Sequence, residues 1–541
     1  LGSVFSGWSG AGCSGGGTCE VTIDAAKSVV ATFTQIPSPP ATQAFTLTVT
    51  KAGSGSGTVT SNPTGINCGT DCSTAFVSST SVTLAATPAA GSVFARWSDT
   101  GCPGTGTCTV TMNATKSVTA TFAGWGVAEL VERDDAGNAE SPQVAFDAAG
   151  NAIAVWKQFD GARNNIWANR FVPGTGWGTA QLIETDPLIA ESPQVAVDAA
   201  GNAIAVWILQ IGTTGGKQIW SNRFVATTTR WGTPVLVQGN AAQASQIDVA
   251  VDVAGNAIAV WSQHDGNVFN VYANRFVATT ASWGTTTRIE TNAGNPFSID
   301  VAFDAAGNAI AVWQQARNIY ANRFVATTAS WGTAEIIETD NVPSADTPRV
   351  AVDTDGNAIA VWVQIDGARF STLANRFVAT TTSWGTPEII RANNLGTAAS
   401  PQVAVDASGN AIAVWQQFGD GGLRGANIWA NRFVAGTGWG TAQLVETNAE
   451  TATSPQVAVD AAGNAIAVWQ QIGDFNVQRN DIWANRFVAG TGLWGASVLL
   501  ETDNTGTASF PQVAVDTDGD AIAVWQQSNG TRTNIWANRF E

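Results

Sequence analysis

One stretch, Gln402-Val-Ala-Val-Asp-Ala-Ser-Gly-Asn-Ala-Ile-Ala-Val-Trp415, returns eight times along this chain with small changes. Each copy ends in Ala-Val-Trp, and successive copies are 49 to 56 residues apart. A repeat period near fifty residues indicates a propeller or another array of repeats, and it constrains the fold more than any local pattern. The eight closing residues are Trp156, Trp207, Trp261, Trp313, Trp362, Trp415, Trp469 and Trp525.

Each repeat contains four short strand-like runs and no helical periodicity. In one repeat they are residues 402–406, 411–415, 427–433 and 439–446, and Asp-x-x-Gly-Asn forms a tight turn between the first two. Eight such units predict an all-β chain whose residues 123–541 form an eight-bladed β-propeller of four-stranded antiparallel blades.

A further run like the fourth strand, residues 125–132, precedes the first repeat, and the chain ends directly after the third run of the eighth. We expect residues 125–132 to pair with the last blade and close the ring. This overlap is similar to that of WD-repeat propellers. The phrase Val-Ala-Val-Asp-x-x-Gly-Asn-Ala also resembles the repeat of NHL-type propellers, over the first hairpin only, and it implies a fold rather than a function.

The N-terminal region contains a second kind of repeat. Residues 2–35 match residues 91–124 at a constant offset, whereas 44–90 have no counterpart before the first copy. We therefore expect residues 1–35 to be the C-terminal part of a truncated module of a longer protein. Residues 36–43 are a Pro-rich linker, and 44–122 are a complete module.

All six cysteines lie in these modules as close pairs. The pairs are Cys13 with Cys19, Cys68 with Cys72, and Cys102 with Cys108. Zinc sites usually combine four ligands and often include histidine, but the single histidine, His264, is far away in the sequence. Local disulfides fit better, and they indicate an oxidising compartment, as for an extracellular protein.

The pattern Ser-Val-Thr-Leu-x-Ala-x-Pro-x-x-Gly-Ser-x-Phe-x-x-Trp-Ser, closing on Lys-Ser-Val-Thr-Ala-Thr-Phe, occurs within residues 81–122. It resembles the divergent internalin-B-type repeats of bacterial surface proteins. The resemblance implies small β-rich, disulfide-pinned spacers that hold a displayed domain away from a cell envelope.

Composition excludes some partners. The formal net charge of −17 disfavours binding to nucleic acid or to anionic membranes. We find no run of eighteen apolar residues, so we expect no membrane span in this sequence.

An aspartate ends each first strand and an arginine recurs in each third strand. We expect these residues to cap turns or pair with each other, and a ring of ligand sites is the alternative. Two turns, Asp353-Thr-Asp355-Gly-Asn357 and Asp516-Thr-Asp518-Gly-Asp520, resemble calcium loops, but most copies have too few carboxylates. We therefore expect no cofactor and no metal.

Variation among the repeats is concentrated in two kinds of connection, which open on one face of the predicted disc. Aromatic and charged residues there suit the stacking of a sugar ring and the bonding of its hydroxyls. The candidate ligand-binding residues are Phe159, Arg163, Phe269, Phe297, Arg369, Phe370, Phe418, Arg424, Phe475, Arg479 and Phe510.

Evidence for catalysis is weak in the sequence. His264 has no visible partners, and Tyr272 and Tyr320 occupy a tryptophan position of the third strand. A hydrolase that uses two carboxylates is an alternative hypothesis. The acids that the loops offer for it are Asp160, Glu191, Asp265 and Asp340. We identify no catalytic residues and expect the chain not to be an enzyme.

Three functional hypotheses follow. The first is an extracellular or cell-surface adhesion protein whose variable face binds glycan or a surface protein. The second is a self-associating structural subunit of a filament, sheath or surface layer. The third is a glycoside-active enzyme.

Overall fold

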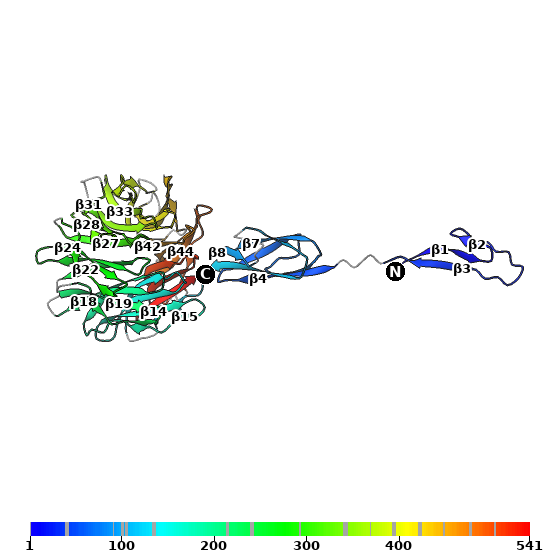
Figure 1. Cartoon of the computed structure of the whole chain (residues 1–541), viewed down its shortest axis with the longest axis horizontal. Helices are drawn as coiled ribbons and strands as arrows, with labels where there is room; N and C mark the ends of the chain where they lie inside the picture. Colours follow the sequence, from blue (N-terminus) through cyan, green and yellow to red (C-terminus); the bar gives the residue numbers. More distant parts are fainter. Residues whose placement is uncertain are drawn as a thin grey trace. The chain divides into compact units, whose positions relative to one another are not determined.

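The computed structural model describes residues 2–37, 43–89, 91–98, 102, 106–132, 137–212, 216–238, 243–291, 294–338, 344–367, 369–391, 396–419, 425–446, 450–474, 479–501 and 505–541. Regular structure in these ranges consists entirely of β-strands (Figure 1). The predicted all-β propeller class, with disulfide-bonded β-rich modules before it, is confirmed. No helix in the described ranges has the length and apolarity needed to cross a membrane.

The chain divides into two compact units. The first comprises Leu1–Lys51, Thr58–Thr87 and Ala95–Ala120, and the second comprises Ala52–Gly57, Pro88–Phe94 and Thr121–Glu541. Each is described by itself below.

The N-terminal modules are built from three small antiparallel sheets. The first sheet has the order β2-β1-β3, the second β6-β4-β10-β8 and the third β5-β7-β9. The second and third sheets contribute Leu47, Val59, Val82, Leu84 and Val118 to a core from which solvent is excluded. The strands are β1 (Ser3–Gly10), β2 (Cys13–Gly15), β3 (Val30–Gln35), β4 (Ala44–Ala52), β5 (Gly57–Asn62), β6 (Ser73–Val77), β7 (Ser81–Pro88), β8 (Ser92–Trp97), β9 (Cys108–Thr111) and β10 (Lys116–Gly124).

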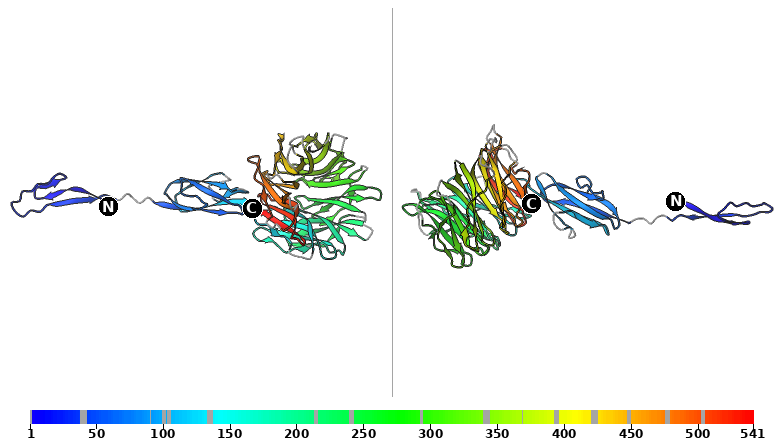
Figure 2. Two further views of the ribbon diagram at one scale, coloured as in Figure 1. Left: turned by 180° about the vertical axis from the view of Figure 1, so that it is seen from behind. Right: turned by 90° about the horizontal axis from the view of Figure 1, so that it is seen from above.

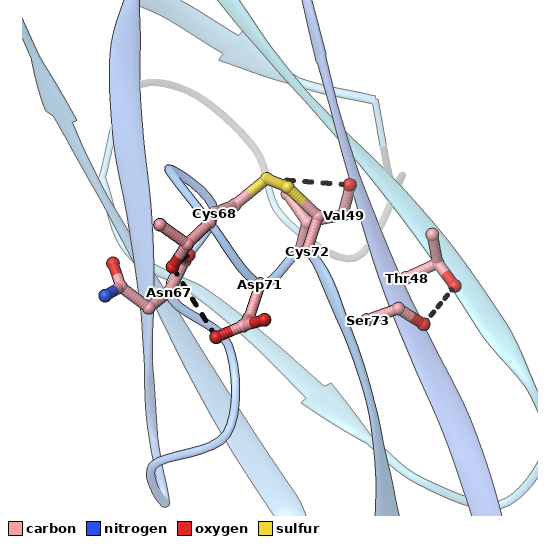
Figure 3. Close-up of a disulfide and its surroundings, with 8 residues drawn as sticks. Thr48, Val49, Asn67, Cys68, Asp71, Cys72 and Ser73 are labelled. Carbon is pink, nitrogen blue, oxygen red and sulfur yellow. Dashed lines mark hydrogen bonds between the residues drawn. A yellow bond between two sulfur atoms is a disulfide. The ribbon is translucent and has the colours of Figure 1, made fainter.

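Three disulfides staple these modules, as the spacing of the cysteines predicts. They join Cys13 to Cys19, Cys68 to Cys72 and Cys102 to Cys108. In Figure 3 the Cys68–Cys72 bond closes a short loop beside β4, where Thr48 and Ser73 form a hydroxyl pair of 3.1 Å. Such staples stabilise domains that are too small to build a large core.

The described part of residues 125–541 forms eight antiparallel sheets, here called blades 1 to 8 in chain order (Figures 1 and 2). Their first strands lie side by side around a common centre, and the last of them, β47, lies next to the first, β12. These innermost strands are β12 (Ala139–Phe146), β17 (Ile189–Val197), β22 (Ala244–Val251), β27 (Pro296–Phe303), β32 (Ala345–Val352), β37 (Thr397–Val405), β42 (Ala452–Val459) and β47 (Ala508–Val515).

Two longer strands follow in each blade. The second strands are β13 (Ala152–Phe159), β18 (Ala203–Ile211), β23 (Ala257–His264), β28 (Ala309–Gln315), β33 (Ala358–Asp366), β38 (Ala411–Phe418), β43 (Ala465–Asp474) and β48 (Ala521–Ser528). The third strands are β14 (Asn164–Val172), β19 (Gly216–Val225), β24 (Phe269–Val277), β29 (Asn318–Val325), β34 (Arg369–Val378), β39 (Ala426–Val434), β44 (Arg479–Val488) and β49 (Thr533–Phe540).

The outermost strand of each blade differs from the prediction of one continuous run. In blades 1 to 7 it is split into two segments of two residues, both paired with the third strand. In blade 1, the side chain of Asn169 replaces part of the backbone ladder, because its Nδ2 donates to the Gly178 carbonyl at 3.1 Å. Short edge strands limit unwanted pairing with other chains.

The outer segments of blades 1 to 4 are β15 (Gly176–Trp177), β16 (Gln181–Leu182), β20 (Arg230–Trp231), β21 (Val235–Leu236), β25 (Ser282–Trp283), β26 (Thr287–Arg288), β30 (Ser330–Trp331) and β31 (Glu335–Ile336). Those of blades 5 to 7 are β35 (Ser383–Trp384), β36 (Glu388–Ile389), β40 (Gly438–Trp439), β41 (Gln443–Leu444), β45 (Leu493–Trp494) and β46 (Val498–Leu499). In blade 8, β11 (Glu129–Leu130) pairs with β49, so segments from the two ends of the propeller region share one sheet.

A β-bulge interrupts every innermost strand. In β12 the register shifts between Glu140 and Gln143, and Ser141 adopts a φ of 56°. The corresponding residues of the other blades, Phe510 included, have φ values of 50° to 55°. Because a bulge bends a strand and re-aims its side chains, these bulges set which residues face the centre of the ring.

The contacts between blades explain the recurring residues. The eight Ala-Val-Trp tryptophans are completely buried. Asn169 Nδ2 of blade 1 donates to the Val131 carbonyl of the strand that completes blade 8, at 2.8 Å. An equivalent asparagine in each other blade donates to the preceding blade, at 2.6 to 2.9 Å.

The recurring aspartates and arginines are structural, as expected. Asp147 caps its own turn, with Oδ1 accepting from the Asn151 N–H at 2.8 Å and Oδ2 from Asn151 Nδ2 at 2.7 Å. The arginines do not pair with these aspartates at ion-pair distance in the described part of the chain; each lies over a phenylalanine of the next blade. Arg170, for example, lies 5.8 Å from the Phe224 ring centroid.

We predict that Trp313→Ala will lower the free energy of unfolding by about 3–5 kcal/mol, because it empties a fully buried site. Urea unfolding followed by circular dichroism measures the change. The control is Phe297→Ala, which truncates a side chain that is 46% exposed and should change stability by about 0.5 kcal/mol or less. Equal effects of the two substitutions would contradict the packing described.

Candidate functional site

The strand registers define two ends of every blade. Phe159, at the end of β13, pairs with Asn164, at the start of β14, and the outer segment β16 ends beside Trp167. The connections between second and third strands, and those between consecutive blades, therefore lie at one end, here called the loop face. The nearly invariant Asp-x-x-Gly-Asn turns lie at the opposite end.

Four of the predicted binding residues are exposed aromatic side chains at the loop end of their strands. The exposed fractions are 39% for Phe159, 46% for Phe297, 41% for Phe418 and 60% for Phe510. They come from blades 1, 4, 6 and 8, so the aromatic character is spread around the face. These residues lie on strands rather than in the predicted loops, because the first and second strands extend further than the sequence pattern indicates.

The other predicted residues are more constrained. Phe269 is half-buried, with its ring 5.1 Å from His264, and Phe370 packs against a blade core. Arg163 Nε donates to Asn165 Oδ1 at 3.0 Å, and Arg479 Nε donates to Asp481 Oδ1 at 2.9 Å. Arg369 is exposed on β34. The predicted residues Arg424 and Phe475 lie outside the described residues.

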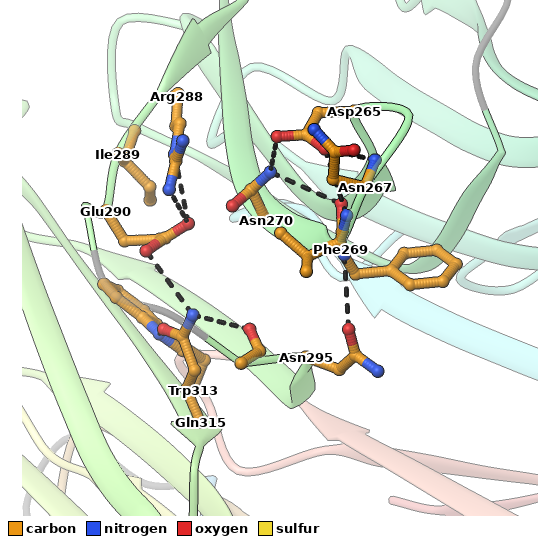
Figure 4. Close-up of polar contacts among 12 residues, drawn as sticks. Asp265, Asn267, Phe269, Asn270, Arg288, Ile289, Glu290, Asn295, Trp313 and Gln315 are labelled. Carbon is orange, nitrogen blue, oxygen red and sulfur yellow. Dashed lines mark hydrogen bonds and ion pairs between the residues drawn. The ribbon is translucent and has the colours of Figure 1, made fainter.

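The acids predicted as possible catalytic groups have structural partners. Asp160 Oδ1 accepts from the Ala162 and Arg163 N–H groups, and these bonds hold its pKa down at about 2. Asp265 has a pKa of about 2 for the same reason, through Asn267 and Val268 (Figure 4). Glu191 pairs with Lys217 at 3.5 Å, and Asp340 lies outside the described residues.

The centre of the propeller contains a polar cavity of about 290 Å³. Each of the eight innermost strands contributes the residue that follows its bulge. Five are glutamines, and three consecutive blades depart from this pattern with Asp248, Asp300 and Arg349. The glutamines are Gln143, Gln194, Gln402, Gln456 and Gln512.

The two aspartates of this central cavity both have raised pKa values. Burial, reinforced by the charge of Asp300, raises the pKa of Asp248 to about 8. Burial also raises the pKa of Asp300, although Arg349 and a hydrogen bond with Asp248 oppose the shift. Their Oδ2 atoms accept from the N–H groups of Val301 at 2.9 Å and Val350 at 2.7 Å. The cavity therefore offers two buried carboxyl groups that hold their protons more tightly than exposed ones do, with the Arg349 guanidinium on the next strand.

A second polar arrangement recurs between blades near the loop face. In seven blades the buried tryptophan Nε1 donates to a glutamine Oε1 two residues further along the strand, at 2.8 to 3.2 Å. In blades 4, 5 and 8 that glutamine also donates to a buried glutamate of the preceding blade. Figure 4 shows this Trp–Gln–Glu chain for Trp313, Gln315 and Glu290.

Neither of these arrangements was predicted from the sequence. The signal for the central cavity was the change from Gln to Asp248, Asp300 and Arg349 at one repeat position. The signal for the Trp–Gln–Glu chain was the recurrence of Gln two residues after the tryptophan. Comparing the eight copies position by position exposes both.

The turns considered for calcium bind their own polypeptide. Asp353 Oδ1 accepts from the Asn357 N–H at 2.8 Å, and Asp516 Oδ1 accepts from the Asp518 N–H at 2.9 Å. In the described ranges, no group of three or more His, Cys, Asp or Glu side chains has the geometry to hold a metal ion.

We predict that Gln315→Leu will destabilise the fold by about 1–3 kcal/mol for each buried group that it leaves unpartnered, because Trp313 Nε1 loses its acceptor. The matched control is Gln314→Leu, the same substitution at the neighbouring half-buried residue. The midpoints of urea unfolding for the two variants measure the difference, and a larger loss for Gln314→Leu would contradict this account.

We predict that stability falls as pH rises from about 4 to about 8, because the folded chain retains a proton on Asp248 that the unfolded chain releases near 3.8. Asp248→Asn should flatten this part of the profile and raise the melting temperature at pH 8. An asparagine still accepts from the Val301 N–H and donates to Asp300. The exposed control Glu388→Gln should keep the wild-type pH profile; if Asp248→Asn also keeps it, the raised pKa of Asp248 is refuted.

Comparison with known proteins identifies one domain by sequence. The divergent InlB B-repeat domain matches residues 46–125, close to the 44–122 predicted for a complete module. No curated protein matches the chain.

Solved structures resemble the chain at low identity. The polysaccharide lyase Uly1 is 10% identical, covers 69% of this chain and 93% of its own, and has a TM-score of 0.43. The Dos1 propeller is 7% identical, with coverage of 77% and 95% and a TM-score of 0.43. An ulvan lyase bound to a GlcA–Rha3S saccharide is 10% identical, with coverage of 61% and 89% and a TM-score of 0.41.

These matches correct one expectation. Two of the three similar structures are polysaccharide lyases by name, so the prediction that the chain is not an enzyme is wrong as a general exclusion and is not kept. At this level of identity the likeness concerns the fold alone.

Proposed function

We propose that this chain is an extracellular, cell-surface protein of bacterial type in which InlB-type modules display an eight-bladed propeller that binds glycan through its loop face. The observation that supports it most directly is the set of exposed phenylalanines Phe159, Phe297, Phe418 and Phe510 on that face. Large aromatic side chains are usually buried, and exposed ones are typical of binding surfaces.

The surroundings of these rings favour a glycan over an apolar protein partner. In blade 1, the side chains of Asp160, Asn165 and Arg163 form a hydrogen-bonded loop that directly follows Phe159 in the sequence. A flat ring next to fixed polar groups suits a sugar, which has apolar C–H faces and hydroxyls around its edge. The four rings lie on separate blades, so weak contacts at several positions would add through avidity.

Three disulfides and an InlB-type module support the proposed location outside the cytoplasm, since such bonds persist in oxidising compartments. The net charge of −17 repels nucleic acid and anionic membranes, and so disfavours both as partners of the chain. The resemblance to NHL and WD propellers remains a prediction about the repeat arrangement.

We predict that Phe297→Ala and Phe510→Ala will each weaken binding to the recognised polysaccharide by about tenfold, without lowering the melting temperature. The polysaccharide is first identified by screening immobilised glycans with the purified chain. Leu182→Ala and Leu444→Ala, which truncate exposed side chains of the outer strands, are the controls and should bind as the wild type does. Equal loss in all four variants, or none, would refute the loop-face proposal.

Self-association is a second candidate, and the outer rim supports it. Leu182, Leu236, Ile336, Ile389 and Leu444 are 39–51% exposed at equivalent positions of five blades. Regular polymers that disappear when these residues become polar would favour a filament or surface-layer subunit.

A glycoside-active enzyme is the third candidate, supported by the two buried carboxyl groups of the central cavity, Asp248 and Asp300, whose pKa values burial raises. Its test is the release of new reducing ends or unsaturated uronates from polysaccharide. That activity should be lost in Asp248→Asn.

A further inference from the structure

The Trp–Gln–Glu chain is interrupted between blades 1 and 2. Leu209 occupies the position that holds Gln158, Gln263 or Gln315 in other blades. As a result Trp207 Nε1 has no hydrogen-bond acceptor, and neither carboxyl oxygen of Glu184 has a hydrogen-bonding partner within the described ranges. Trp207 is completely buried and Glu184 is 1% exposed, so a hydrogen bond left unmade at either group is costly.

Both orphaned groups line one cavity of about 280 Å³. Leu209, Trp220 and Pro234 give it apolar walls, and Pro187, which is exposed, belongs to the connection between blades 1 and 2 on the loop face. Trp220 Nε1 already donates to Gln218 Oε1 at 3.2 Å. The volume is many times that of one water molecule, which occupies about 30 Å³ in the liquid.

The equivalent cavity between blades 2 and 3 shows what is special here. It is lined by Gln238, Gln263 and Tyr272. Gln263 Oε1 accepts from Trp261 Nε1 at 3.0 Å, and Gln238 Oε1 accepts from the Ile219 N–H at 3.1 Å. Both glutamine Oε1 atoms of that cavity are therefore bonded within the protein, whereas the Trp207 N–H and the Glu184 carboxyl between blades 1 and 2 are available to a ligand.

A ligand of this cavity needs a hydrogen-bond donor for the Glu184 carboxyl and an acceptor for the Trp207 N–H. It also needs an apolar surface that packs against the Trp, Leu and Pro walls. Burial raises the pKa of Glu184 to about 7. The carboxyl is thus both ionised and protonated near neutral pH. A hydroxyl group, which can donate or accept, suits both forms, whereas an ammonium group suits only the ionised one.

We propose that this cavity is a subsite for a single sugar ring of a glycan, with hydroxyls bonded to Glu184 and Trp207 and a C–H face packed on Trp220. The inference rests on the proposed glycan binding and adds to it the place and the size of one recognised unit. It also explains why Leu209 departs from the repeat pattern. Without the glutamine there is room for the ligand, and the Trp207 N–H and the Glu184 carboxyl are left to bind it.

The test restores the missing side chain with Leu209→Gln. The probes are the methyl glycosides of glucose, galactose, mannose, rhamnose, N-acetylglucosamine and glucuronic acid, observed by saturation-transfer NMR on the whole chain. We expect at least one glycoside to bind the wild type saturably, and Leu209→Gln to weaken it more than tenfold. The control Leu182→Gln makes the same change at an exposed outer-strand residue and should bind as the wild type does.

A second variant guards against a folding defect. Glu184→Gln preserves the size of the side chain, and we expect it to weaken the glycoside severalfold while the melting temperature stays the same or rises. The Trp207 indole N–H resonance, assigned with Trp207→Phe, should move when the glycoside binds and should not move in Leu209→Gln.

The outcomes separate this inference from the proposed function. If polysaccharide binding depends on Phe297 and Phe510 but no glycoside binds, or if Leu209→Gln binds one as well as the wild type does, the subsite is refuted and the loop face stands. If the glycoside result holds but the phenylalanine variants bind normally, the loop-face proposal fails and the subsite stands. Binding of methylguanidinium instead of any glycoside overturns the assignment to a sugar.

Discussion

The buried hydrogen bond from an asparagine of one blade to a backbone carbonyl of the blade before it holds the ring together. Asn169 is 3% exposed and Asn538 is 1% exposed, so these bonds form where water cannot replace them. An unmade bond at such a position costs about 1–3 kcal/mol, which gives each blade a strong preference for having a neighbour. The tryptophans reinforce this preference: Trp261, for example, packs in one cluster with Ile204, Val206 and Ile208 of the preceding blade. No blade completes its own core.

This dependence on neighbours separates the parts of the repeat that are free to vary from those that are not. The Asp-x-x-Gly-Asn turns are fixed because the aspartate oxygens are used by the turn itself, and Gly201 must approach Asp147 of the blade before it. The loop end has no repeated bond of this kind across all blades. Sequence differences therefore accumulate there, and a binding surface can be built without disturbing the ring.

Much of this architecture follows from sequence reasoning, and the exceptions have physical causes. Alternating strands, turn chemistry and the cysteine spacings predict the sheets, the hairpins and the disulfides. The split outer strands were missed because the Asn169 side chain takes the place of a ladder bond, which no hydrophobic pattern reports. The bulges were missed because residues such as Ser141 and Phe510 adopt a positive φ without glycine. Four of the seven phenylalanine candidates are exposed, whereas Phe370 packs against a blade core.

The functional candidates share a rule that comes from the repeats. In a ring of near-identical blades, a recurring polar side chain such as Gln315 bonds both a tryptophan of its own blade and a glutamate of the preceding blade, so one substitution can leave two partners unsatisfied. Leu209 stands where other blades have glutamine, and it leaves Trp207 Nε1 and the Glu184 carboxyl without hydrogen-bonding partners. Asp248 and Asp300 stand where five other blades place an uncharged glutamine around the central cavity. These departures are costly within a buried interface. Unless a ligand, a proton or a neighbouring charge such as Arg349 compensates them, they lower stability, and we therefore propose that the positions that break the repeat carry the chemistry of this propeller.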